Sequence, residues 1–151
     1  ARPGDDEFGA IYAQADLLSI LPDYDFVVIA APLTPQTEGL FGPAEFKAMH
    51  PSARLINIGR GPIVQTSALV AALENGEIDG AALDVFEQEP LPADHPLWDF
   101  DNVHISAHMA GDFFGWRKAL SKQFITNFHR WRTGKPLHNV VDKAQGFIGT
   151  Q

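Results

Sequence analysis

The stretch Ala53-Arg54-Leu55-Ile56-Asn57-Ile58-Gly59-Arg60-Gly61-Pro62 begins as a short, largely apolar run and stops abruptly at Gly-Arg-Gly. Strands that are buried on both faces have continuous apolar runs of this kind. In open α/β sheets, ligands bind just beyond the carboxyl ends of such strands. The pattern therefore predicts that Arg60 is presented to a ligand, although a surface arginine in an ordinary strand-to-helix turn would have the same local sequence.

Strands and helices alternate along the rest of the chain. Strands are predicted over residues 25–31, 54–58, 80–85 and 102–106, and helices over 13–21, 44–49, 65–75 and 115–133. Residues 1–9 and 86–100 are predicted to be loops, and residues 10–12 a very short strand. This alternation is typical of a parallel sheet covered by helices on both faces through right-handed crossovers. The predicted fold class is α/β, with a doubly wound, Rossmann-like sheet.

The last predicted helix carries a stripe of large apolar residues. They recur every three or four positions: Trp116, Leu120, Phe124, Phe128 and Trp131. A helix buries itself through such a stripe, so we expect these side chains to pack in the core and not to form an aromatic ligand site.

Composition narrows the class of partner. The 151 residues carry a formal net charge of -8, which argues against binding to nucleic acid or to an anionic membrane surface. No apolar run is long enough to cross a bilayer, and no secretory signal is recognisable. The absence of cysteine suits a reducing compartment. We therefore expect a soluble, cytoplasmic protein that binds small molecules or other proteins.

Three residues with complementary chemistry follow the predicted strands: Arg60, Glu89 and His108. Because the carboxyl ends of parallel strands meet at one edge of the sheet, these side chains are expected to lie together. A guanidinium can hold a carboxylate and an adjacent carbonyl oxygen. Histidine exchanges protons near neutral pH, and a neighbouring carboxylate stabilises the imidazolium. Together the three suit the reduction of a 2-keto acid.

Each of these residues also has a structural interpretation. A glutamate beside a proline, such as Glu89, is commonly a solvated loop carboxylate, and His108 in a turn is commonly a structural hydrogen-bond donor. A metal site is not predicted, because His104 and His108 would lie roughly 13 Å apart on extended backbone, too far to share an ion.

Four segments resemble the signature segments of the D-isomer-specific 2-hydroxyacid dehydrogenases, a family that includes glycerate, phosphoglycerate, hydroxypyruvate and glyoxylate reductases. They occur in the family's order: residues 32–40 (PLTPQTEGL), 56–61 (INIGRG), 80–91 (GAALDVFEQEPL) and 108–111 (HMAG). The resemblance covers roughly Asp16 to Gly111.

The resemblance implies a role for each candidate. Arg60 would bind the substrate carboxylate and carbonyl, His108 would be the acid/base, and Glu89 would partner His108. Asp84 matches the family's aspartate near the nicotinamide carboxamide. The cofactor, NAD or NADP, would be lined by Ala31, Pro32, Ile58, Gly59, Arg60, Asp84, His108, Ala110 and Gly111.

The chain departs from the family's pattern in two ways. Residues 112–116 read DFFGW where many members have small and hydroxyl residues, which leaves substrate preference open. No G-x-G-x-x-G occurs, so the phosphate-binding turn is missing, and so is the family's substrate domain. We therefore interpret residues 1–151 as a partial dinucleotide-binding domain without its first two strands. Residues 112–151 are expected to run back toward the missing domain, and Arg2 weakly favours NADP over NAD.

The leading hypothesis is thus a fragment of an oxidoreductase that transfers a hydride between NAD(P)H and a small 2-keto or 2-hydroxy acid. We expect the isolated chain to be inactive and the whole enzyme to form a homodimer. The alternative is a truncated α/β module that serves as an interaction or structural partner without turnover.

Overall fold

The computed structural model describes residues 3–144 and 146–148. The chain divides into two compact units, residues 1–108 and residues 109–151.

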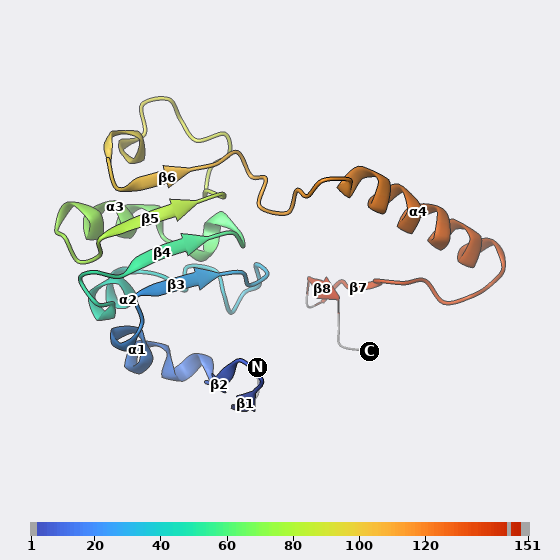
Figure 1. Cartoon of the computed structure of the whole chain (residues 1–151), viewed down its shortest axis with the longest axis horizontal. Helices are drawn as coiled ribbons and strands as arrows, with labels where there is room; N and C mark the ends of the chain where they lie inside the picture. Colours follow the sequence, from blue (N-terminus) through green and yellow to red (C-terminus); the bar gives the residue numbers. More distant parts are fainter. Residues whose placement is uncertain (1–2, 145, 149–151) are drawn as a thin grey trace. The chain divides into compact units, whose positions relative to one another are not determined.

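A four-stranded parallel sheet forms the centre of the first unit. Its strands are β3 (Phe26–Ile29), β4 (Arg54–Asn57), β5 (Gly80–Leu83) and β6 (Val103–Ile105), in the order β3-β4-β5-β6. They lie side by side and point the same way in Figure 1. All four strands were predicted, and the observed ones are shorter at their ends. The α/β, Rossmann-like fold class is confirmed.

One face of this sheet carries the core. The register pairs Val27 with Leu55, Leu55 with Ala81, and Ala81 with Val103, so these side chains share a face. The helices α1 (Leu17–Ile20), α2 (Pro43–Ala48) and α3 (Thr66–Glu74) contribute to the same cluster of buried residues. Its largest fully buried apolar members are Phe46, Leu21, Leu55, Ile63, Leu69, Ile78 and Leu97.

Within the first unit, helices cover one face of the sheet and the opposite face is open, so the expectation of helices on both faces is not met inside residues 1–108. Phe26 is 58% exposed and Val28 is 55% exposed, and both project to the side away from the core. The strand order explains this. Because β3 to β6 follow one another across the sheet without reversal, right-handed crossovers place the connecting helices on a single face.

Short helical turns complete the connections. Residues 13–21, predicted as a helix, form the 3-10 turn η1 (Gln14–Asp16), then α1, with η2 (Leu21–Asp23) following. Two further 3-10 turns, η3 (Gly61–Ile63) and η4 (Pro96–Asp99), lie in the loops after β4 and β5. No side-chain hydrogen bond from the N-cap residue caps the start of α3. The N-cap residue is Gln65, and the Glu87 carboxylate accepts a 2.7 Å hydrogen bond from the Thr66 N–H.

The amino-terminal segment forms a small hairpin, in which β1 (Gly4–Asp6) pairs antiparallel with β2 (Gly9–Ile11). β2 overlaps the very short strand predicted over residues 10–12, whereas β1 lies where a loop was predicted. The Asp6 carboxylate accepts hydrogen bonds from the N–H groups of Phe8 and Gly9, which closes the turn. Among the described residues, β2 pairs with β1 and not with the main sheet.

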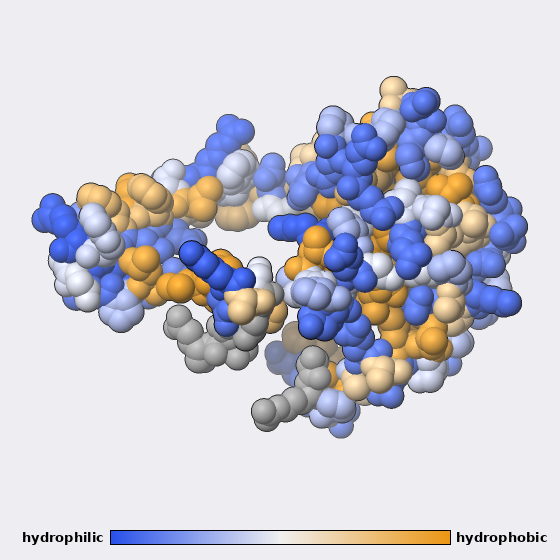
Figure 2. All heavy atoms as spheres, turned by 180° about the vertical axis from the view of Figure 1, so that it is seen from behind, coloured by the Kyte–Doolittle hydropathy of each residue, from blue (hydrophilic) through white to orange (hydrophobic). Residues whose placement is uncertain are grey.

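The second unit contains α4 (Trp116–Arg132) and a hairpin of β7 (Val141–Asp142) and β8 (Phe147–Ile148). The helix was predicted almost to the residue, but its apolar stripe is not buried. Leu120, Phe124, Phe128 and Trp131 are 47% to 71% exposed, and Figure 2 shows apolar surface along this segment. One helix and a two-stranded hairpin offer too little surface to cover such a stripe. Within the described part of the chain, no helix is long and apolar enough to cross a membrane.

Candidate active site

The turn after β4 presents Arg60 at the carboxyl end of the sheet, as predicted. Its side chain is exposed, and Nη1 donates a 2.6 Å hydrogen bond to the Gly59 carbonyl. The fully buried Asn57 braces this turn from below: its Oδ1 accepts from the Gly59 N–H at 3.1 Å and its Nδ2 donates to the Arg60 carbonyl at 3.2 Å. The backbone that carries Arg60 is therefore fixed by a buried amide.

Gly61 lets the Arg60 turn approach the loop after β5. A Cβ atom at Gly61 would lie 1.8 Å from the Phe86 carbonyl oxygen and 2.5 Å from the Glu87 N. No side chain fits in that space, so glycine is needed for this contact. The two loops that carry Arg60 and Glu89 are thus packed backbone against backbone.

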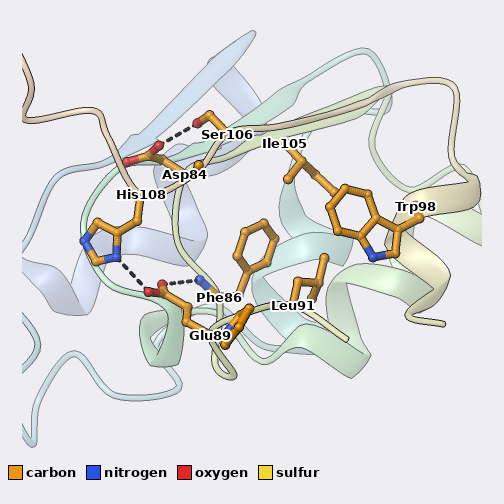
Figure 3. Close-up of a pocket in the computed structure, with 10 residues that line it drawn as sticks. Asp84, Phe86, Glu89, Leu91, Trp98, Ile105, Ser106 and His108 are labelled. Carbon is orange, nitrogen blue, oxygen red and sulfur yellow. Dashed lines mark hydrogen bonds and ion pairs between the residues drawn. The ribbon is translucent and has the colours of Figure 1, made fainter. Parts of the chain in front are cut away.

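Glu89 and His108 form a direct pair (Figure 3). His108 Nδ1 lies 2.7 Å from Glu89 Oε2, while Glu89 Oε1 accepts a 3.0 Å hydrogen bond from the Phe86 N–H. The hydrogen bond from His108, followed by that from Phe86, holds the pKa of Glu89 below its ordinary value. The carboxylate is therefore kept ionised beside the imidazole.

His108 has a left-handed backbone conformation, with φ of 52°. Residues other than glycine seldom adopt this conformation, and such outliers concentrate at functional sites. The turn directs the side chain toward Glu89 immediately after β6, in keeping with a functional role for this pair.

Asp84 and Ser106 lie beside this pair, at the ends of β5 and β6. Asp84 is only 4% exposed, and Ser106 Oγ donates a 2.5 Å hydrogen bond to its Oδ1. Both residues line a cavity of about 430 Å³ with Glu89 and His108. Figure 3 shows its apolar wall, made of Phe86, Leu91, Trp98 and Ile105.

The structure brings most of the predicted cofactor residues to one edge of the sheet. Ala31 and Pro32 follow β3, Ile58 and Gly59 follow β4, and Asp84 follows β5. Ala110 and Gly111 belong to the second unit. Arg2 lies outside the described residues.

This edge fits a dinucleotide in two respects. Ile58 is 44% exposed at the end of a strand, which offers an apolar surface to a flat ring. A Cβ atom at Gly59 would lie 2.8 Å from the Ala31 carbonyl oxygen, so glycine lets the ends of β3 and β4 approach each other. Among the described residues, no group of three or more His, Cys, Asp or Glu side chains could hold a metal ion.

No role was predicted from the sequence for three residues of the site: Asn57, Gly61 and Ser106. Asn57 carried a usable signal, because it is a polar residue inside an otherwise apolar run that is buried. The other two carried none. Gly61 matters through a contact with a distant loop, and Ser106 matters through the register between β5 and β6.

Comparison with known proteins identifies the family. Residues 2–110 match the family model of the D-isomer specific 2-hydroxyacid dehydrogenase NAD-binding domain. The chain is 50% identical over 141 residues to a glyoxylate/hydroxypyruvate reductase B from Salmonella newport, covering 93% of this chain and 43% of that relative. The corresponding reductase from Shigella boydii is 41% identical over 141 residues. The chain therefore spans less than half the length of these curated relatives.

Solved structures give the same result. An NADPH-dependent glyoxylate/hydroxypyruvate reductase from Sinorhizobium meliloti, in complex with NADP and sulfate, matches with a TM-score of 0.83 and 35% identity, over 90% of this chain and 44% of that one. A D-isomer specific 2-hydroxyacid dehydrogenase from Xanthobacter autotrophicus, in complex with NADPH and MES, matches with a TM-score of 0.77 and 40% identity, over 85% of this chain and 52% of that one. The chain belongs to the D-isomer specific 2-hydroxyacid dehydrogenase family and contains sequence of its NAD-binding domain.

Proposed function

We propose that this chain is part of an NAD(P)-dependent reductase that interconverts a small 2-keto acid and the corresponding D-2-hydroxy acid. The observation that carries the proposal is the 2.7 Å contact between His108 Nδ1 and Glu89 Oε2, beside the turn that presents Arg60. An acid/base pair next to a guanidinium is better explained by catalysis than by an interaction module without turnover.

The pair assigns a proton to each nitrogen of His108. An ionised carboxylate only accepts hydrogen bonds, so Nδ1 donates to Glu89 and carries a hydrogen. The exchangeable proton is then on Nε2. In the reductive direction, His108 donates this proton from Nε2 to the substrate oxygen, and Glu89 stabilises the ring in its charged form.

Arg60 binds the acid in this scheme. Its exposed guanidinium holds the substrate carboxylate and polarises the neighbouring carbonyl. Asn57 and Gly61 keep the Arg60 turn in place, so the substrate is oriented relative to His108.

The cofactor would be held at the strand ends of the first unit by Ala31, Pro32, Ile58, Gly59 and Asp84. When bound, NAD(P)H supplies the hydride that these side chains cannot provide. The relatives crystallised with NADP or NADPH support this assignment.

The proposal also covers the whole protein. We infer that the chain works as part of a longer enzyme, because the curated relatives that it matches are more than twice its length. A cytoplasmic location is in keeping with the absence of cysteine. The exposed apolar residues favour association, and a homodimer is the assembly we expect.

The test is His108→Asn in the intact gene product, assayed with glyoxylate and hydroxypyruvate. We expect kcat to fall about 10²- to 10⁴-fold while NAD(P)H affinity is nearly unchanged, since asparagine cannot exchange the proton. His104→Asn is the matched control, because His104 lies on the open face of the sheet, away from the pair. Arg60→Lys should also weaken substrate binding, because lysine lacks the planar fork. Retention of wild-type kcat by His108→Asn would exclude this mechanism.

A further inference from the structure

The hydrogen bond between Ser106 and Asp84 takes no part in the proposed proton transfer, although both residues line the same cavity as Glu89 and His108. Ser106 Oγ donates to Asp84 Oδ1 at 2.5 Å, within the range of a hydrogen bond to an ionised oxygen. Asp84 is 4% exposed and lines the same cavity as His108. The question is which function a nearly buried carboxylate serves beside the acid/base pair.

The backbone around these two residues is already fixed without their side chains. The Asp84 N–H donates to the Asn57 carbonyl at 3.0 Å, and the Ser106 N–H donates to the Leu83 carbonyl at 3.0 Å. Both bonds continue the ladders of the parallel sheet by one residue. The Ser106 hydroxyl is therefore not needed to join β5 to β6, and its particular effect is to fix the rotation of the Asp84 carboxylate.

The chemistry of the donor is also selective. A hydroxyl holds the carboxylate without neutralising it, whereas a lysine or arginine would cancel its charge. A carboxylate offers about four acceptor positions, so accepting from Ser106 is compatible with accepting from a ligand N–H. The group is suited to an amide NH₂ whose orientation must be set.

We propose that Ser106 is a positioning residue that holds the Asp84 carboxylate in the orientation in which it accepts a hydrogen bond from the carboxamide of the nicotinamide ring. This inference rests on the proposed function, because it needs the cofactor at this edge of the sheet. Ser106 would act through Asp84 and thereby help to set the plane of the ring relative to His108.

The test measures binding in the intact gene product. NADH or NADPH is used, whichever the unmodified protein binds more tightly, and Kd is determined from nicotinamide fluorescence. Ser106→Ala should weaken this binding about 5- to 10-fold, and Ser106→Thr, which keeps the hydroxyl, should restore most of it. Ser52→Ala is the matched control, since it removes an exposed hydroxyl that contacts only the neighbouring His50 ring among the contacts described; its Kd should stay at the wild-type value.

Two further ligands distinguish positioning from general damage. ADP-ribose, 2′-phosphorylated for an NADP-preferring protein, lacks the nicotinamide, so its affinity should be the same in Ser106→Ala and wild type. The 3-acetylpyridine analogue of the cofactor has no N–H on that ring substituent, so the penalty of Ser106→Ala should shrink to less than about 2-fold.

An equal loss of affinity for ADP-ribose and for the complete cofactor would overturn the assignment and show that Ser106 is only structural. A wild-type Kd for the complete cofactor in Ser106→Ala would overturn it as well, while leaving the proposed function intact. Failure of the unmodified protein to bind either nucleotide would overturn the proposed function and this inference with it.

Discussion

Glu89 shows how one residue links stability to pH. Its pKa lies below the ordinary value of 4.5 because the folded protein donates hydrogen bonds to the carboxylate. A lowered pKa contributes stability above about pH 4.5 that is lost as the pH falls through the folded-state value. The side chain is 37% exposed, so solvent screening limits the contribution to no more than about 1 kcal/mol.

We therefore predict that the stability difference between wild type and Glu89→Gln is largest above pH 5 and shrinks between about pH 4.5 and pH 3. Urea unfolding at half-unit pH steps across this range measures the difference directly. A gap that stays constant down to pH 3 would show that ionisation of Glu89 contributes nothing to the folded state.

The close backbone contact at Gly61 leads to a prediction about packing. Gly61→Ala would place a Cβ atom 1.8 Å from the Phe86 carbonyl oxygen, which forces apart the loops that carry Arg60 and Glu89. We expect a loss of about 1–3 kcal/mol in the unfolding free energy and, in the intact gene product, a fall in kcat/KM. Gly4→Ala is the control, because a Cβ there meets nothing within 4 Å. Equal urea midpoints for the two variants would contradict the contact.

The site was predictable from sequence only as far as side-chain chemistry and strand order reach. Arg60, Glu89 and His108 were expected at one edge because parallel strands deliver their carboxyl ends there, and the Glu89–His108 contact confirms that part of the geometry. Their catalytic roles stay predictions. Asn57 and Gly61, which hold the Arg60 turn, act through tertiary contacts that no local pattern encodes.

At the scale of elements, the strands were predictable because each is a short apolar run bounded by turn residues. An apolar run such as residues 26–29 does not show whether one face of the strand or both faces are covered. Phe26 and Val28 are large apolar residues of the kind usually found buried, yet they are exposed. Covering them requires a helix on their face of the sheet, and the order of strands β3 to β6 places no connecting helix on that face. The apolar stripe of α4 was misjudged for the same reason: it predicts a helix that needs a partner surface, but not where that surface is.

The division of the chain into two units leads to a prediction about which elements fold without the others. All described buried side chains lie between Leu21 and Leu97, inside the first unit. A chain of residues 1–108 should therefore unfold cooperatively, with a Tm within about 5 °C of the 151-residue chain, a shift worth about 1 kcal/mol. Thermal unfolding followed by circular dichroism compares the two. A broad, non-cooperative transition in the shorter chain would mean that residues 109–151 are needed for the core.

At the scale of the whole molecule, β3 is an edge strand among the described residues, with Phe26 and Val28 exposed on one side. An apolar edge of this kind is prone to pair with another chain. The same edge adjoins the positions proposed for the cofactor, Ala31 and Pro32. The open edge strand is therefore part of the surface that the isolated chain would offer to a cofactor.

We predict that the 151-residue chain alone does not bind NADH or NADPH usefully and does not reduce a keto acid. The sequence contains no G-x-G-x-x-G, so it lacks the turn and helix N-terminus that would hold the pyrophosphate. The groups at the strand ends can contact the nicotinamide half, but they do not replace that anion site. Titration of the purified chain with each nucleotide, followed by nicotinamide fluorescence, should show no saturation up to about 1 mM, the upper end of the usual KM range. The intact gene product, titrated in parallel, should saturate. Low-micromolar binding by a monomeric 151-residue chain would show that the strand ends suffice to hold the cofactor and that the phosphate-binding turn is dispensable.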